Sequence, residues 1–113
     1  MKRGEIYFVD LDPVLGREQA GRRPVVVVSI EAVNKLPLVV IAVPGTDGSN
    51  VRRDFPTNVR VTASESGLPT ETVFLCFQVR ALDPGRFPAR PAGQLAPTAL
   101  TQVEDALRYS MGL

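Results

Sequence analysis

The sequence predicts a mainly β fold, a small barrel of five strands closed by one C-terminal helix. Three observations carry this prediction. Short runs rich in β-branched and aromatic residues alternate with segments that contain glycine and proline, which is typical of a small barrel or sandwich. Apolar residues recur at helical spacing near the end of the chain. The length of 113 residues suits one domain, so residues 1–113 are expected to form a single unit.

Each expected strand lies between turn or loop residues. Four valines follow Pro24 without interruption, so the strand there should be buried on both faces. Pro37 should break the chain before the third strand, and Pro44 should end that strand. The expected strands cover residues 5–11, 24–29, 38–43, 58–62 and 72–81.

The chain ends differently. Residues 84–97 contain four prolines, so this segment should be extended or in turns. A helix should then begin at Pro97 or Thr98 and stop at Gly112, because proline is favoured in a first turn and glycine just past a last one. Its apolar stripe consists of Leu100, Val103, Leu107 and Met111.

Composition excludes several kinds of site. The chain has no histidine and one cysteine, Cys76, so a Ser-His-Asp or Cys-His pair and a zinc site of histidine and cysteine are excluded. The lone cysteine lies in an apolar run, which favours a buried thiol and a reducing compartment. No segment approaches the roughly 20 apolar residues of a membrane span, and no secretory stretch follows Met1. A cytoplasmic protein without membrane attachment is expected.

Positive charge is concentrated in the first half of the chain. The net charge is only +1, but residues 13–60 hold seven basic against four acidic residues. Two polar loops, residues 16–23 and 46–55, emerge from adjacent expected strands, and they would meet on one side of the barrel if the strands pair. The loops would then gather Arg17, Arg22, Arg23, Arg52, Arg53, Glu18, Thr46 and Ser49.

This set of residues suits a phosphodiester substrate. Arginine binds phosphate through forked, bidentate contacts and can stabilise charge that grows in a transition state. RNA can be cleaved without a metal, because the neighbouring 2′-hydroxyl can act as the nucleophile. Glu18 could serve as a base, or could instead orient Arg22 or Arg23 by an ion pair. The plainer alternatives are a solvated charged loop and a Thr46 hydroxyl that caps a turn after Pro44.

At these residues the sequence resembles the MazF/PemK toxin family. The resemblance spans the chain and is carried by Arg3-Gly4-Glu5-Ile6-Tyr7, Asp10-Leu11-Asp12-Pro13, Gly16-x-Glu18-Gln19-x-Gly21-x-Arg23-Pro24, Val43-Pro44-x-Thr46 and Gln78-Val79-Arg80-x-Leu82-Asp83. It implies an SH3-like small β-barrel of the MazF, PemK and CcdB type, and a homodimer silenced by a cognate antitoxin. It also implies a metal-independent endoribonuclease without a cofactor, which cuts single-stranded RNA to leave 2′,3′-cyclic phosphate and 5′-hydroxyl ends.

The resemblance assigns catalytic roles to Arg23, Thr46 and Glu18. RNA contacts are expected from Arg17, Gln19, Arg22, Ser49, Arg52, Arg53 and Gln78, and the antitoxin should present an acidic, extended segment to the same basic groove. Arg17 departs from the small polar residue that is common in the family, and residues 47–55 follow no close pattern. Two other functions stay open: a toxin of the same barrel that binds a protein such as DNA gyrase without catalysis, and a barrel that only binds.

Overall fold

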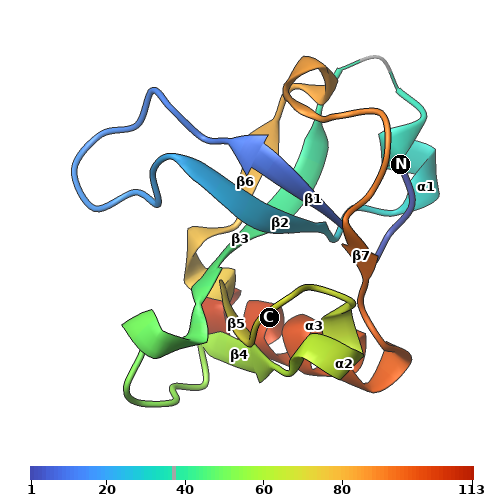
Figure 1. The fold of residues 1–113 in the computed structure, drawn as a ribbon. Coiled ribbons are helices and arrows are strands. Elements are labelled where there is room, and N and C mark those ends of the chain that lie inside the picture. The colour runs from blue at the N-terminus through green and yellow to red at the C-terminus, as the bar shows by residue number, and fades with distance from the viewer. Residues whose placement is uncertain (37) are drawn as a thin grey trace.

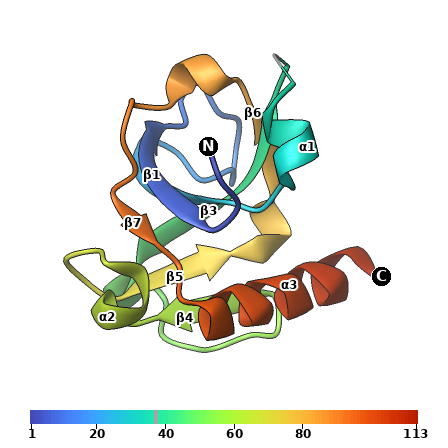
Figure 2. The ribbon, with the colours of Figure 1, turned by 90° about the vertical axis from the view of Figure 1, so that its right-hand side faces the viewer.

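The computed structural model describes residues 1–36 and 38–113, so the break expected at Pro37 lies outside the described residues. The chain forms a mainly antiparallel β-sheet that curls into a half-barrel, with a C-terminal helix α3 (Pro97–Met111) packed across one end (Figures 1 and 2). The mainly β class with a C-terminal helix is therefore confirmed. Among the described residues, no helix is long and apolar enough to cross a membrane.

Among the described residues seven strands form this sheet, two more than the five expected. Six of them follow the order β4-β5-β3-β2-β1-β7, and β6 pairs with β3 off this path. Their bounds are β1 Glu5–Asp10, β2 Arg22–Val27, β3 Val40–Asp47, β4 Asn58–Val61, β5 Thr72–Leu75, β6 Arg80–Leu82 and β7 Gly93–Gln94.

Strand β2 begins two residues earlier than expected, so Arg22 and Arg23 belong to the strand rather than to the loop before it. They pair with Asp10 and Val9 of β1 in an antiparallel register. The pairing continues through Pro24, which lies opposite Phe8. The ladder with β1 therefore fixes the backbone of both arginines.

The valines of β2 are buried on both faces, as the sequence predicts. Side chains alternate across a strand, and Val26 packs in a core formed with β4, β5 and α3. Val25 and Val27 pack in a second core with β1, the start of β3 and β6. Val25, Val26 and Val27 are each fully buried, whereas Val28 just beyond the strand is partly exposed.

Strand β3 does not end at Pro44, as the sequence suggested, but runs on to Asp47. Residues 42–44 pair with β2 along one edge. Along the other edge, residues 40–42 pair with β6 and residues 45–47 pair with β5. The missing N–H of Pro44 therefore falls where β3 changes partners, and proline is tolerated there. A side chain at Gly45 would lie 2.8 Å from Thr72 and 3.1 Å from Phe74, so only glycine allows β5 to pack this closely.

The single strand expected over residues 72–81 is divided in two. Strand β5 pairs with β4 and with the end of β3, whereas β6 pairs with the start of β3. The 3-10 helix η2 (Cys76–Gln78) joins them and carries the chain from one part of the sheet to the other. The Cys76 thiol is fully buried, as expected, and this burial raises its pKa to about 12.

Two short helices were not expected from the sequence. Helix α1 (Glu31–Asn34) follows β2, and α2 (Ala63–Ser66) replaces part of the turn expected before β5. A capping box begins α2, because Thr62 Oγ1 accepts from the Glu65 N–H and Glu65 Oε1 accepts from the Thr62 N–H. The segment 84–97 is largely irregular but contains the 3-10 helix η3 (Pro84–Arg86) and β7.

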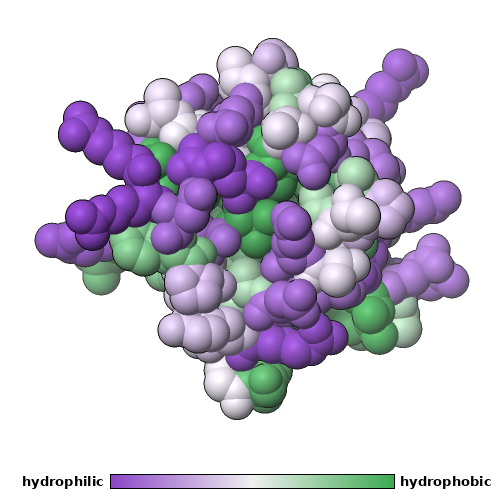
Figure 3. Space-filling model, turned by 90° about the horizontal axis from the view of Figure 1, so that it is seen from below, coloured by the Kyte–Doolittle hydropathy of each residue, from purple (hydrophilic) through white to green (hydrophobic). Residues whose placement is uncertain are grey.

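Helix α3 begins at Pro97 and ends before Gly112, which has a positive φ of 72°. Its stripe packs on the chain's own sheet: Val103 is fully buried, and Leu100 and Leu107 pack against the first core. Met111 remains 59% exposed. Figure 3 shows that hydrophilic side chains cover most of the face seen from below, with hydrophobic ones in small separate areas. The stripe alone therefore does not require a second copy of the chain to cover it.

Candidate active site

The register of β2 and β3 brings Arg23 and Thr46 together. Val25 pairs with Pro44, and two residues further along each strand the Arg23 Nη1 atom lies 3.5 Å from Thr46 Oγ1. Thr46 is only 6% exposed. Both residues lie in strands, which corrects the expectation that Thr46 occupies a turn and Arg23 a loop. The predicted pair is nevertheless adjacent, on a rigid part of the fold.

The hydrogen bonds of this pair leave donors for a ligand. Thr46 Oγ1 accepts from Asn50 Nδ2 at 3.0 Å and from Arg23, which occupies both of its lone pairs. The hydroxyl proton is then free to point at another acceptor. Arg23 Nε donates to the Ala20 carbonyl at 2.9 Å, which fixes the plane of the guanidinium. The other N–H groups of Arg23 can bind two oxygens of one phosphate.

Arg22 leaves β2 on the opposite face from Arg23. Its guanidinium carbon lies 4.7 Å from the centre of the Phe8 ring, in a cation–π contact. The two arginines border a shared hollow at the edge of the strand, together with Asp47 and Thr70. Arg22 thus lies near Arg23, although its side chain leaves the strand on the other face.

Glu18 does not pair with either arginine. Its Oε1 atom accepts a hydrogen bond from the N–H of Leu15 within the same loop. Across the described residues, no ion pair or hydrogen bond joins Glu18 to Arg22, Arg23 or Thr46. The alternative in which Glu18 orients one of these arginines by an ion pair is therefore not the arrangement in this structure. The carboxylate instead holds the loop that precedes β2.

Gln19 and Gln78 meet although they lie far apart in the sequence. The Gln19 N–H donates to Gln78 Oε1 at 2.6 Å, and Gln78 Nε2 donates to the Arg17 carbonyl at 3.4 Å. These contacts close one side of a pocket of about 330 Å³, which we name the Phe77 pocket. It is lined by residues 17–19 of the loop, Pro44 of β3 and residues 77–80.

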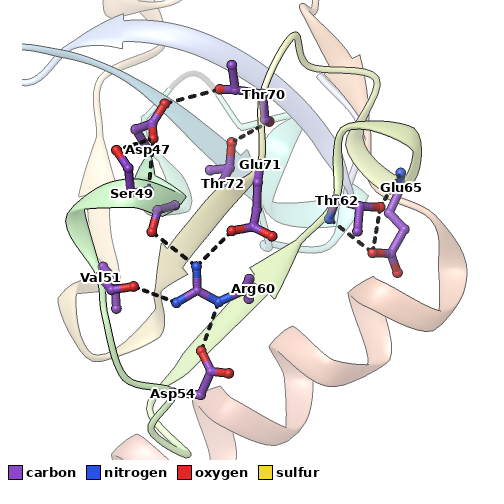
Figure 4. Close-up of polar contacts among 11 residues, drawn as sticks. Asp47, Ser49, Val51, Asp54, Arg60, Thr62, Glu65, Thr70, Glu71 and Thr72 are labelled. Atoms are coloured by element: carbon purple, nitrogen blue, oxygen red, sulfur yellow. Dashed lines mark hydrogen bonds and ion pairs between the residues drawn. The ribbon is translucent and has the colours of Figure 1, made fainter.

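The second loop is ordered mainly by Arg60, a residue that the sequence did not single out. Arg60 Nε lies 2.9 Å from Asp54 Oδ1, and Nη1 lies 2.8 Å from Glu71 Oε1 (Figure 4). The same guanidinium donates to the carbonyls of Gly48 at 3.1 Å and Val51 at 2.6 Å. Hydrogen bonds to Glu71 and then Asp54 raise the pKa of Arg60 further.

Ser49 belongs to the 3-10 helix η1 (Gly48–Asn50), which this network holds. Its N–H and hydroxyl both donate to Asp47 Oδ1, at 2.9 and 2.7 Å, and they lower the pKa of that carboxyl. Asn50, in the same turn, donates to Thr46. Arg52 and Arg53 are exposed, and neither forms an ion pair within the described residues. The structure thus places the loop beside Thr46 and leaves these two arginines free for a ligand.

Replacing Arg60 by glutamine should loosen the loop of residues 48–57, because two ion pairs and two carbonyl contacts are lost. Trypsin should then cut after Arg52 and Arg53 faster than in the wild-type protein. Arg108→Gln is the matched control, since it removes an exposed ion pair with Asp105 on α3, and it should leave this rate unchanged. Equal cleavage rates for Arg60→Gln and wild type would show that Arg60 does not order the loop.

Comparisons with known proteins show the family of the chain. Residues 2–111 match the family of PemK-like, MazF-like toxins of type II toxin-antitoxin systems. A relative from Staphylococcus epidermidis, named endoribonuclease MazF, is 36% identical over 113 residues, covering 100% of this chain and 92% of that protein.

Two solved structures show the same fold over the whole chain. The crystal structure of MazF from Deinococcus radiodurans has a TM-score of 0.83 and 26% identity, covering 100% of this chain and 97% of that chain. An endoribonuclease in complex with its cognate antitoxin, from a mycobacterial species, has a TM-score of 0.80 and 26% identity, covering 100% and 96%. With the match over residues 2–111, these findings show that the chain belongs to the PemK-like, MazF-like family of type II toxins.

Proposed function

We propose that residues 1–113 act as one domain that cleaves single-stranded RNA, with Arg23 and Thr46 at the reacting phosphate. The observation that supports this most is their contact across β2 and β3, which leaves donors of both side chains free. The relative from Staphylococcus epidermidis is named an endoribonuclease. Binding to DNA gyrase without catalysis, the alternative drawn from the sequence, finds no support in the comparisons.

In the proposed reaction, the 2′-oxygen of one nucleotide attacks the adjacent phosphorus, and the bond from phosphorus to the 5′-oxygen breaks. The 2′-hydroxyl proton leaves to a base and the 5′-oxygen gains a proton, so the products are a 2′,3′-cyclic phosphate and a 5′-hydroxyl. Arg23 stabilises the charge that grows on the phosphoryl oxygens. The Thr46 hydroxyl donates a hydrogen bond to one of them.

The other site residues are proposed to bind the flanking RNA rather than to react. Glu18 was assigned a catalytic role by resemblance; we propose that it orders the loop before β2, because its carboxylate already binds the Leu15 N–H. The proposed RNA contacts are Arg17, Gln19, Arg22, Ser49, Arg52, Arg53 and Gln78. Most of their side chains lie on the two loops and η2, on either side of the pair.

Cleavage should not require a divalent metal, because the nucleophile belongs to the substrate and Arg23 supplies the positive charge. We expect purified protein to cut a long RNA into discrete fragments in EDTA, with cyclic phosphate at the new 3′ ends. Mass spectrometry of the fragments identifies these ends. Activity that disappears in EDTA and returns with magnesium would contradict the proposed mechanism.

Arg23→Ala should lower the cleavage rate by about 10²–10³, the usual loss for one preorganised donor at a transition state. Arg23→Lys keeps the charge but loses the forked geometry, so it should recover only part of that rate. Single-turnover cleavage of a labelled RNA measures both variants, with circular dichroism as the check on folding. Near-wild-type cleavage by folded Arg23→Ala would remove the central assignment.

We propose that the chain works as a symmetric homodimer, in which two sets of loops form one longer groove. Five large hydrophobic side chains between residues 30 and 41 support an interface, since each is at least 38% exposed; they are Ile30, Leu36, Leu38, Val39 and Ile41. Light scattering at micromolar concentration should show a dimer, and Leu38→Glu should shift it to monomer. A wild-type protein that is monomeric at that concentration would refute the proposal.

We also propose a cognate antitoxin that blocks the basic groove with an acidic, extended segment. A structure of a family relative with its cognate antitoxin supports this. Acidic side chains would occupy the places of phosphates, and apolar anchors would add the affinity that exposed ion pairs lack. Inhibitor and uncleavable RNA should therefore compete, and inhibitor binding should weaken as salt rises. Independent binding of both to one dimer face would rule out this account.

A further inference from the structure

We propose that the Phe77 pocket binds one nucleobase of the RNA, on a nucleotide next to the cleaved phosphate, with the Phe77 ring as the stacking surface. This inference rests on the RNA cleavage proposed above. It names the site that reads one base of the target sequence, and assigns roles to Phe77 and Arg80.

Phe77 is a large aromatic side chain that the fold does not bury. It lies in η2 between the buried Cys76 and the pocket-lining Gln78, and it is 54% exposed. An exposed ring beside a pocket is the arrangement on which proteins stack unpaired bases of single-stranded RNA. A pocket of about 330 Å³ is large enough for one small planar group.

The amide of Gln78 is held in one orientation. Its Oε1 atom accepts the Gln19 N–H, and its Nε2 atom donates to the Arg17 carbonyl. Each amide atom keeps capacity for one further bond, a lone pair on Oε1 and an N–H on Nε2. A donor and an acceptor side by side are what the edge of a base needs.

Arg80 adds a donor for which the described part of the chain holds no acceptor. Its Nη1 atom is buried, and no hydrogen-bond acceptor reaches it within the described residues. Buried polar groups are normally satisfied, so an unpaired donor on a pocket-lining residue needs an explanation. A small rotation of the Arg80 side chain toward a base in the pocket would give this donor a carbonyl oxygen or ring nitrogen as its acceptor.

The pocket lies close to the reacting groups. Pro44 lines it and precedes Thr46 by two residues on the same side of β3, a separation of about 7 Å along a strand. Gln19 also lines it, and the next residue, Ala20, provides the carbonyl that orients Arg23. A base in the pocket therefore belongs to a nucleotide beside the phosphate bound by Arg23.

The test uses a short RNA that contains a site mapped by wild-type cleavage in EDTA, with a 2′-deoxy sugar at the attacked position to prevent cleavage. Each nucleotide that flanks the scissile phosphate is replaced in turn by an abasic one, and affinity is measured by fluorescence anisotropy. Phe77→Ala should weaken binding of the intact RNA about 5- to 150-fold, the range for loss of one base–aromatic stack.

One abasic position should weaken wild-type binding by at least a similar factor, and should weaken Phe77→Ala clearly less, because the loss of the ring and the loss of the base remove the same stacking contact. Phe77→Tyr keeps the ring and should behave like wild type. Tyr109→Ala, which removes a 63% exposed ring from α3, is the matched control and should keep the wild-type response at every position.

Three results would overturn the proposal. The first is unchanged affinity of Phe77→Ala, and the second is an additive loss at every abasic position. The third is a Phe77→Ala protein that becomes monomeric while wild type is dimeric, which would make Phe77 an interface residue. Failure of the proposed function would be recognised separately. In that case the wild-type protein cleaves no RNA in EDTA, and this is known before any variant is tested.

Discussion

The pairing of β3 with three other strands is the constraint on which the fold and the candidate site depend. β3 pairs with β2 on one edge, and with β6 and then β5 on the other. This arrangement requires the strand to continue through Pro44 and Gly45, past the point where β6 ends and β5 begins. The same continuation places Thr46 opposite Arg23. The residues that join the parts of the sheet thus also position the groups proposed to act on RNA.

The arginines near this strand serve different purposes. Arg60 is bound by two carboxylates and two carbonyls and holds the loop after β3 in place (Figure 4). Exposed ion pairs add little to global stability, so its main effect is on local geometry. Through η1 that geometry extends to Asn50, which donates to the Thr46 hydroxyl. Among the described residues, the Arg23 side chain makes two hydrogen bonds and keeps its other N–H groups available.

Much of the fold could be predicted from patterns within short segments of the sequence. The β-branched runs identified the β class, and the spacing of apolar residues identified α3 to within a residue. The Thr62-x-x-Glu65 capping pattern was also present and would have predicted the start of α2. Strand ends were less predictable. The rule that proline and glycine end strands failed at Pro44. Strand β3 continues through Pro44 and Gly45 because it pairs there with β2 and β5, whose residues lie far away in the sequence.

In the candidate site, too, some features could be predicted from the sequence and others could not. The proximity of Arg23 and Thr46 was expected if the strands next to their loops pair, and the resemblance added their catalytic roles. The structure supplies the physical basis of the proximity in the register of β2 and β3. The contacts of Glu18 and Arg60 could not be foreseen. Glu18 faces its own loop, and Arg60 draws its partners from residues 48–54 and from Glu71. Such contacts depend on how the loops fold back, which local residue preferences do not determine.

A double-mutant cycle on Arg23 and Thr46 tests most directly whether the pair acts as one unit. Single-turnover cleavage rates would be measured in EDTA for wild type, Arg23→Ala, Thr46→Ala and the double variant, all shown to be folded. The account predicts a coupling energy of about 0.5–3 kcal/mol, because each substitution already disrupts the contact that the other would remove. Additive losses, with coupling near zero, would contradict it and show that the two side chains act independently.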